Sequence, residues 1–527
     1  MEEHETNRLV KGALILTLAG LISKILSAGY RIPLQNLTGD VGFYIYQQVY
    51  PILGTAMMLS LYGFPQAISK MVIDLDKDGK KRSFSNFYVP VFSILLFING
   101  TLFFLLWFNA EALAIWVGDR SLTDTYRYAA YVFLLVPFTS LLRGVFQGNL
   151  YMKPTAYSQI AEQLIRVFLI ISAAVLAANH VLGLYEIGKA ASLASIAGGI
   201  TAIIILFVFF RIKKPFSMEK QKVPWNYFVK TLMVLGLVAA LNHMVLLVIQ
   251  LADAFTLIPG LMDFGLSKIE AMEAKGIFDR GQPLIQLGTV LGSSFTLAVV
   301  PSISKEKLRE HQSEFYFYIR SALLFSFYLA IAATIGLIVI FPETNILLFQ
   351  DDKGTADLQI LVLSVFLSSL AITASSILQG LGYIKRTAAF ILIAFFAKWM
   401  LNQLFVPLFG ITGGAAATVI SLLGLLIIVM IEVKRKLPEL CFFKYIDWRA
   451  LIKSSLWMIT YIVLIDILIP DQLITSRLHL LGYVLFVVVT GACIFGVSLL
   501  RGQVFTEREL SLLPYAFLFI RIHKGRL

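Results

Sequence analysis

The sequence predicts an all-α polytopic membrane protein with about fourteen transmembrane helices, arranged as two six-helix lobes followed by two extra C-terminal helices. Of its 527 residues, 58% are hydrophobic and 14% are charged, whereas a soluble domain is about half apolar and a quarter charged. Apolar runs of about 20 residues, the length that spans a bilayer, recur along the whole chain. These observations exclude an ordinary soluble fold.

Runs of apolar residues bounded by charged residues, Gly or Pro define the candidate spans. They cover about residues 12–34, 42–64, 87–109, 127–149, 155–178, 187–210, 230–258, 282–303, 317–341, 358–381, 387–407, 412–432, 450–470 and 478–500. The weakest boundaries lie at Gly39–Gly42 and Gly410–Gly413, so counts of twelve or thirteen also fit the sequence. The acidic, polar start and the lack of a cleavage pattern favour a retained first helix.

The distribution of Lys and Arg predicts the orientation, because cytoplasmic loops carry the excess of positive charge. With the N-terminus inside, 31 of the 44 Lys and Arg residues lie in or beside inner segments and 8 lie in or beside outer segments. Both termini are therefore expected in the cytoplasm of a multi-pass cell-membrane protein. The net charge of +12 is spread over eight inner segments, which favours contact with anionic membrane lipids over nucleic acid.

An internal repeat organises the chain. Residues 147–156 and residues 379–388 share six identities at an offset of 232. Repeats of an even number of spans keep their orientation, so we expect two lobes related by an axis along the membrane normal. The predicted parts are the N-lobe (1–211), a basic cytoplasmic linker (212–229), the C-lobe (230–434), helices 13 and 14 (435–503) and an interfacial tail (504–527). This architecture suits a transporter, although channels also contain repeats.

Motifs for catalysis are missing from the sequence. No stretch outside the spans is long enough for a catalytic domain, and there is no Walker A, HExxH or nucleophile-elbow motif. Cys441 and Cys493 have no CxxC or Cys/His spacing, and the six histidines are scattered. We therefore expect no enzyme activity, no cofactor and no metal site.

Five basic residues lie inside the predicted spans, namely Lys24, Arg31, Arg143, Arg166 and Lys398. An ionised residue there costs about 3 kcal/mol on insertion scales, so it normally faces a cavity or a partner. Lys24 and Arg31 are seven residues apart on one helix face and are expected to line a cavity, with snorkelling as the alternative. For Arg143, snorkelling and cavity exposure fit equally well.

Two of these cations differ in their predicted partners. Glu162 and Arg166 have the i, i+4 order that favours an intrahelical ion pair, and neutralisation of two membrane charges is the simpler interpretation. Lys398 occupies the position of Arg166 in the repeat, yet it has no acidic residue four positions earlier. Lys398 is therefore predicted to be an unpaired cation.

Other polar residues in the spans are candidates for the same site. Asp253 is expected to pair with Lys24 or Arg31, or to bind a coupling cation. Gln47 and Gln48 fall in a helix that a proline interrupts, and they are expected to line the cavity with hydrogen-bonding groups.

Two motifs resemble a known group. Gly63–Lys70 reads Gly-Phe-Pro-x-Ala-Ile-Ser-Lys, and Arg143–Val167 contains Arg-Gly-x-x-Gln-Gly followed by Gln-x-x-Glu-Gln-x-x-Arg-Val in its second half. Both resemble the polysaccharide-biosynthesis branch of the multidrug/oligosaccharidyl-lipid/polysaccharide (MOP) exporter superfamily. Within it, the sequence is similar to the stage V sporulation protein B group and, more distantly, to the lipid II flippases.

The resemblance implies roles for particular residues. Lipid II flippases carry basic residues in the first helix that face a cationic cavity, and Lys24 and Arg31 stand at near-matching positions. Gly42 stands where those flippases have an acidic residue, which leaves Asp40 as the substitute. Arg280 resembles an arginine that faces the cavity, although a longer interval after it shifts it toward the outer mouth.

The resemblance also implies a function. It is that of an alternating-access flippase for an undecaprenyl-pyrophosphate-linked saccharide, a precursor of peptidoglycan or another cell-envelope polysaccharide. A cavity with more cations than anions suits a diphosphate. The alternative is a cation-coupled multidrug antiporter of the same superfamily, which favours acidic residues at its site. The implied partners are the lipid-linked saccharide, membrane lipids and enzymes of cell-envelope synthesis.

Overall fold

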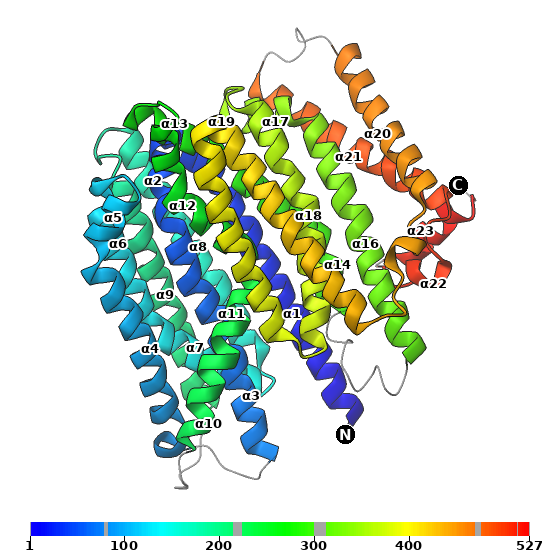
Figure 1. Cartoon of the computed structure of the whole chain (residues 1–527). Coiled ribbons are helices and arrows are strands. Elements are labelled where there is room, and N and C mark those ends of the chain that lie inside the picture. Colours follow the sequence, from blue (N-terminus) through cyan, green and yellow to red (C-terminus); the bar gives the residue numbers. More distant parts are fainter. Residues whose placement is uncertain are drawn as a thin grey trace. The chain divides into compact units, whose positions relative to one another are not determined.

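The computed structural model describes residues 2–77, 83–213, 224–299, 312–469, 476–513 and 515–525. These ranges are almost entirely helical (Figure 1), which confirms the predicted all-α membrane fold. Within them, 12 helices are long and apolar enough to cross a membrane. Two of the 12, Ile15–Asp76 with 62 residues and Ile384–Lys436 with 53 residues, are longer than one crossing requires. The count of fourteen spans stays a prediction.

The chain forms two compact units. The first contains Met1–Asp279 and Ile384–Ala417, and the second contains Arg280–Tyr383 and Thr418–Leu527. The predicted division into lobes at 1–211 and 230–434, and the axis that relates them, stay predictions. Of the predicted linker, residues 214–223 lie outside the described residues.

The first unit consists of long helices and short helical turns. Its α-helices are α1 (Glu2–Gly29), α2 (Arg31–Met58), α3 (Phe64–Lys77), α4 (Val89–Phe108), α5 (Ala110–Trp116), α6 (Thr123–Ala130), α7 (Val136–Gly148), α8 (Met152–Ala178), α9 (Glu186–Lys213), α10 (Trp225–Lys230), α11 (Leu237–His243), α12 (Val245–Asp263), α13 (Lys268–Asp279) and the first part of α19 (Ile384–Lys436). Turns of π-helix, Leu59–Gly63, Phe84–Tyr88 and Thr231–Gly236, extend α2, α4 and α10.

Two glycines break long helices at the boundaries that the sequence marked as weak. Gly39 in α2 has a φ of 67°, and Gly410 in α19 has a φ of 57°. A positive φ is open to glycine at little cost because it has no Cβ. The two breaks predicted near these glycines are therefore kinks within α2 and α19.

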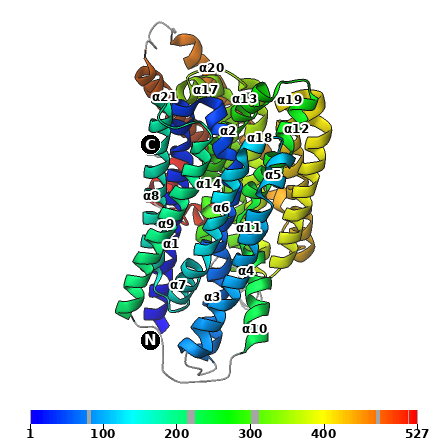
Figure 2. The ribbon, with the colours of Figure 1, turned by 90° about the vertical axis from the view of Figure 1, so that its left-hand side faces the viewer.

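Small residues bring the helices of the first unit into close contact. A Cβ on Gly144 of α7 would meet Ile68 of α3, and a Cβ on Gly148 would meet Val72. Glycine at both positions lets the two helices approach closely, as is common between membrane helices. Figure 2 shows α8 and α9 running side by side.

The second unit is also helical. Its helices are α14 (Gly281–Val299), α16 (Gln312–Val339), α17 (Phe341–Phe349), α18 (Thr355–Gly380), the remainder of α19, α20 (Trp448–Leu468), α21 (Arg477–Arg501), α22 (Glu507–Leu510) and α23 (Ala516–His523). Buried hydroxyl pairs join α18 to its neighbours: Thr289 to Ser368 at 2.7 Å and Ser326 to Thr373 at 2.8 Å. Such bonds between helices stabilise membrane bundles.

The C-terminal tail differs from the single interfacial stretch that the sequence predicts. It forms two short helices, α22 and α23, and Phe505 before them is buried. The Phe505 ring stacks on Phe325 of α16 with centroids 4.6 Å apart. Phe505 therefore packs inside the second unit, whereas Phe517 of α23 is exposed and remains available to the membrane interface.

Candidate functional site

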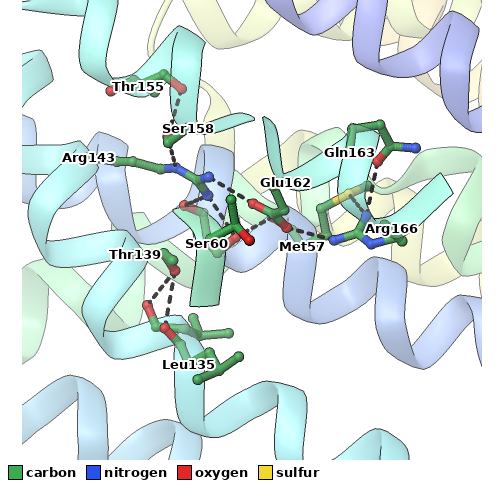
Figure 3. Close-up of polar contacts among 12 residues, drawn as sticks. Met57, Ser60, Leu135, Thr139, Arg143, Thr155, Ser158, Glu162, Gln163 and Arg166 are labelled. Carbon is green, nitrogen blue, oxygen red and sulfur yellow. Dashed lines mark hydrogen bonds and ion pairs between the residues drawn. The ribbon is translucent and has the colours of Figure 1, made fainter. Parts of the chain in front are cut away.

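A buried ion network joins α7 and α8 in the first unit (Figure 3). Arg143 of α7 is fully buried. Its Nη2 donates to Glu162 Oε2 at 2.8 Å, its Nε donates to the Ser158 hydroxyl at 3.2 Å, and its Nη1 donates to the Ser60 hydroxyl at 3.2 Å. Every nitrogen of this guanidinium has an acceptor, so the snorkelling interpretation of Arg143 is wrong.

Glu162 is shared between two arginines. Its second carboxylate oxygen, Oε1, accepts from Arg166 Nη2 at 2.6 Å, which confirms the predicted i, i+4 pair. Arg166 Nη1 also donates to Gln163 Oε1 at 3.1 Å. One carboxylate between two guanidinium groups leaves a net charge of about +1 in this network. The contact with Arg143 was not predicted because it joins different helices.

Lys24 lies beside this network. It lines a small cavity, with about 20 Å³ accessible to water, together with Glu162 and Gln163 of α8. Ser23 and Ser27 flank Lys24 on the same wall. The space suits about one water molecule. The predicted cavity-facing position of Lys24 thus has a polar environment, and its role toward a substrate stays a prediction.

Arg31, the first residue of α2, has a different environment. It is fully buried, so the snorkelling interpretation is wrong, and it is not among the residues that line the cavity at Lys24. Its guanidinium carbon lies 3.9 Å from the centroid of the Tyr50 ring. Its Nε, Nη1 and Nη2 make no hydrogen bond of normal geometry among the described residues, although the Tyr30 hydroxyl lies close enough to interact with the guanidinium. Tyr30 and Tyr46 are close by and hydrogen bond to each other through their hydroxyls.

Lys398 is paired, contrary to the prediction from sequence. Its Nζ lies 2.8 Å from Asp253 Oδ1, and it donates to Asn402 Oδ1 and to the Gly414 carbonyl, each at 2.8 Å. Lys398 and Asp253 are both buried. The prediction that Asp253 pairs with Lys24 or Arg31 is also wrong, since Lys398 holds it.

Asn402 completes this second network. Its amide nitrogen donates to Asp253 Oδ1 at 2.9 Å and to the Thr256 hydroxyl at 2.7 Å. Sequence reasoning missed Asn402, although its position four residues after Lys398 was a usable signal.

Arg280 belongs to the second unit. It is buried and forms a two-point ion pair with Asp351, which follows α17; Arg280 Nη2 lies 3.0 Å from Asp351 Oδ2. Partial burial would raise the pKa of Asp351, but hydrogen bonds and charge from Arg280 outweigh it and hold that pKa below 3.8. The predicted cavity role of Arg280 stays a prediction, and the carboxylate partner is new.

The remaining candidates lie in α2. Gln35 Nε2 donates to Asp40 Oδ1 at 3.0 Å, just beyond the kink at Gly39. Gln47 and Gln48 are buried, and Gln47 Oε1 has no partner among the described residues. Their predicted contribution to a cavity lining stays a prediction.

A cluster that the sequence did not predict surrounds Asp119. This carboxylate is buried and accepts from the Tyr185 hydroxyl at 2.8 Å and from Lys268 Nζ at 2.8 Å. Tyr44 also donates to it at 3.4 Å. The four residues come from segments predicted to lie at the outer side, so the cluster links α13 to α2 and to the loop before α9.

Among the described residues, no group of three or more His, Cys, Asp or Glu side chains could hold a metal ion. The candidate functional groups among the described residues are therefore buried cations and the side chains that balance their charge.

Three relatives in Bacillus subtilis (strain 168) match the chain. The membrane protein YabM is 37% identical over 520 residues, which cover 96% of this chain and 94% of YabM. The lipid II flippase MurJ is 24% identical over 459 residues, covering 82% and 83% of the two chains. Stage V sporulation protein B is 29% identical over 214 residues, covering 40% and 41%.

Solved structures share the fold. A structure of lipid II flippase MurJ in an inward closed conformation matches with a TM-score of 0.68 and 14% identity, covering 93% of this chain and 100% of that one. An inward-facing multidrug resistance MATE family transporter of the MOP superfamily matches with a TM-score of 0.57 and 16% identity, covering 81% and 98%. Where these names state an activity, it is transport rather than catalysis.

The model of one protein family, described as polysaccharide biosynthesis protein, matches residues 9–307. This match spans more than half of the chain and includes both motifs that carry the resemblance. It agrees with the relatives and with the MurJ-like and MATE-like fold. The chain therefore belongs to the polysaccharide biosynthesis protein family.

Proposed function

We propose that this protein moves an undecaprenyl-pyrophosphate-linked saccharide, a precursor of peptidoglycan or another cell-envelope polysaccharide, from the inner to the outer leaflet by alternating access. Arg31 carries the proposal. Its buried guanidinium makes no hydrogen bond of normal geometry among the described residues and has only the tyrosine hydroxyls close to it. A charge buried without such bonds is costly, and diphosphate oxygens match the planar fork of arginine.

The surroundings of Arg31 support a bound anion. The guanidinium stacks on Tyr50, which fixes its plane and leaves its N–H edge for a ligand. The neighbouring hydroxyls of Tyr30 and Tyr46 are neutral, and the buried Asp279 that lies within electrostatic range of Arg31 is already paired with Lys275.

Family membership supports the saccharide part of the proposal. The matched family is named for polysaccharide biosynthesis, and the MurJ relatives are named as flippases of lipid II. A polyprenyl tail can stay in lipid while its headgroup crosses, so the protein needs polar surface only for the headgroup. In this proposal the membrane lipids surround the polyprenyl tail during transport and also contact the protein.

The alternative is a cation-coupled multidrug antiporter, which the MATE-like fold supports. Such a transporter needs a carboxylate that is free to bind a cation. Glu162 lies between two arginines, and Asp253 lies against Lys398. Glu162 and Asp253 therefore already have counter-charges, which disfavours the antiporter.

The test uses purified full-length protein in vesicles with a fluorescent undecaprenyl-pyrophosphate disaccharide. Arg31→Ala should lose most of the flipping rate, and Arg31→Lys should recover only part of it, because lysine keeps the charge but lacks the fork. Arg449→Ala, at an exposed position, is the control and should flip at the wild-type rate. Full flipping by Arg31→Ala would refute the proposed role.

Stability provides a second readout for the same variants. Arg31→Ala removes the contact with Tyr50 and leaves a cavity, but it breaks no ion pair, so it should destabilise the protein by less than the about 3–5 kcal/mol typical of a broken buried pair. If Arg31→Ala unfolds much more easily, Arg31 is structural and the transport result no longer supports substrate binding.

A further inference from the structure

A second polar site lies apart from the cations. It is a pocket of about 340 Å³ in the first unit, formed by the ends of α5 and α12 and the first part of α19. The predicted topology places these ends at the outer side. Among the described residues, those that line this pocket are Trp116, Phe255, Thr256, Pro259, Gly260, Asp263, Trp399, Gln403 and Pro407.

Three aromatic rings meet at this pocket. Ring centroids are 5.2 Å apart for Trp116 and Phe255, 5.4 Å for Trp116 and Trp399, and 5.7 Å for Phe255 and Trp399. The three residues come from three different segments. Scattered interfacial tryptophans are normal in membrane proteins, but an aromatic belt does not require that rings from separate helices converge on one cavity.

The polar groups of the pocket are of a particular kind. Asp263 offers acceptors, and Gln403 offers both an acceptor and donors. Pro259 and Pro407 lack N–H groups, so the carbonyls of the residues four positions earlier, Phe255 and Gln403, lose their usual helical donor. Each proline therefore removes one helical hydrogen bond beside the pocket wall.

The charge of the pocket excludes one ligand class. The lining includes Asp263 but no Lys or Arg, so a phosphate would be repelled. A compact ammonium ion would need rings arranged around an empty space, as in an aromatic cage. Here the rings pack on one another, and Trp116 remains 58% exposed, which makes a platform rather than a cage.

We propose that this pocket binds the saccharide part of the transported molecule at the outer side. A pyranose has an apolar C–H face, which suits an aromatic platform, and a rim of hydroxyls that donate and accept hydrogen bonds. Apolar walls with a few placed polar groups are the usual composition of small-molecule sites. The inference rests on the proposed function and assigns the neutral sugar to a different place from the diphosphate.

The pocket wall is firmly held. Thr256 accepts from Asn402, and Asn402 contacts the pair formed by Lys398 and Asp253. Gly260 of α12 lies close to Val406 of α19, where a Cβ would meet Val406 Cγ1 at 2.9 Å. The buried network therefore positions the two helices that carry most of the pocket.

The test measures saccharide binding by the full chain in phosphatidylglycerol nanodiscs, using saturation-transfer NMR titrations. The probes are the neutral disaccharides diacetylchitobiose, maltose and galactobiose, with tetraphenylphosphonium as a cationic competitor. At least one disaccharide should bind, and Trp116→Ala should weaken its binding about 10-fold. Trp457→Ala is the matched control, because Trp457 of α20 is 57% exposed and lies outside the pocket; it should bind like wild type.

A surface variant keeps the test valid if Trp116→Ala folds poorly. Gln403 is exposed, so Gln403→Leu should fold normally and weaken saccharide binding several-fold. Equal binding by Trp116→Ala and Trp457→Ala, or no binding of any disaccharide by wild type, would overturn the inference. Displacement of the disaccharide by tetraphenylphosphonium in wild type would also overturn it, since the pocket would then select cations.

The two proposals fail separately. Flipping of the lipid-linked saccharide without saccharide binding at this pocket defeats only the inference about the pocket. Saccharide binding that depends on Trp116, together with absent flipping, defeats only the proposed transport function.

Discussion

The buried cations differ in how their charge is balanced. Arg143, Arg166 and Lys398 each lie against a buried carboxylate, whereas Arg31 lies against aromatic rings and makes no hydrogen bond of normal geometry among the described residues. A paired charge inside a membrane protein supports the fold, and an unpaired one marks a place for a ligand. This contrast separates the structural cations from the candidate binding residue.

Glu162 should be more important for stability than an ordinary acidic residue. Glu162→Gln leaves Arg143 buried without its counter-ion, and loss of one partner of a buried pair typically costs about 3–5 kcal/mol. A denaturation curve in detergent should therefore shift strongly. Glu111→Gln is the control, because Glu111 pairs with Arg120 at an exposed position and such pairs contribute little. Equal shifts for both variants would show that the network of Glu162 is not a stabilising element.

The pair formed by Asp253 and Lys398 allows a double-mutant cycle. Lys398→Met alone and Asp253→Asn alone should each destabilise the protein, because each leaves a buried charge unpaired. The double variant should be more stable than the sum of the two single changes predicts. Thermal unfolding of all four proteins checks this. Simple additivity would mean that the two side chains do not depend on each other.

The sequence predicted some of these contacts and not others, for a physical reason. The pair of Glu162 with Arg166 follows from helical spacing alone. Lys398 and Asp253 lie on different helices far apart in the chain, and a single sequence carries no signal for such packing. The same holds for Arg280 and Asp351, and for the fully partnered state of Arg143.

At the scale of elements, the kinks at glycines are the features best predicted from sequence. Glycine clusters marked breaks near Gly39 and Gly410, and both have a positive φ. The division of the tail into α22 and α23, with Phe505 in the core of the second unit, was missed. Its mixed composition fits both an interfacial helix and a packed turn, so composition alone did not distinguish the two.

Gly39→Ala tests the kink in α2. An added Cβ meets nothing within 4 Å, so the only expected penalty is backbone strain: φ 67° with ψ −176° is a conformation essentially limited to glycine, and it costs another residue about 1–3 kcal/mol. Gly100→Ala is the matched control, because Gly100 in α4 also has open space around it but has a helical conformation. Alanine at position 100 should stabilise the protein by up to about 1 kcal/mol. Shifts of the same sign in thermal unfolding would contradict the kink at Gly39.

The ion pair that joins Arg280 to the loop after α17 should respond to acid. The pKa of Asp351 is lower in the folded protein than its ordinary value near 3.8. The ion pair therefore contributes its full stability above pH 3.8, and this contribution is lost as the pH falls through the pKa of the folded state. Unfolding midpoints measured from about pH 6 down to about pH 3 should fall less steeply for Asp351→Asn than for wild type. Asp352→Asn, at the exposed neighbouring position, should lose stability with acid as wild type does. If Asp351→Asn also loses stability as steeply as wild type, the ion pair with Arg280 does not cause the acid response.

At the scale of the whole molecule, the first unit contains two chemically distinct candidate sites. The proposed diphosphate site is the cation Arg31, and the proposed sugar site is the aromatic pocket at Trp116, whose described lining includes Asp263 but no Lys or Arg. A lipid-linked saccharide carries both chemistries in one molecule. The fold class was predicted from composition and charge pattern, and the family from two motifs. The lobe boundary, the span count and the orientation remain predictions.

The most direct test measures flipping of a fluorescent undecaprenyl-pyrophosphate disaccharide in vesicles with an imposed membrane potential and no ion gradient. Outward movement of an anion across an inside-negative potential gains about 2.3 kcal/mol per net charge per 100 mV. If the protein's cations stay fixed in the field, the potential should accelerate outward flipping, and collapsing it should slow the reaction. Transport of a cationic dye, driven by a proton or sodium gradient and without movement of the lipid-linked saccharide, would contradict the account.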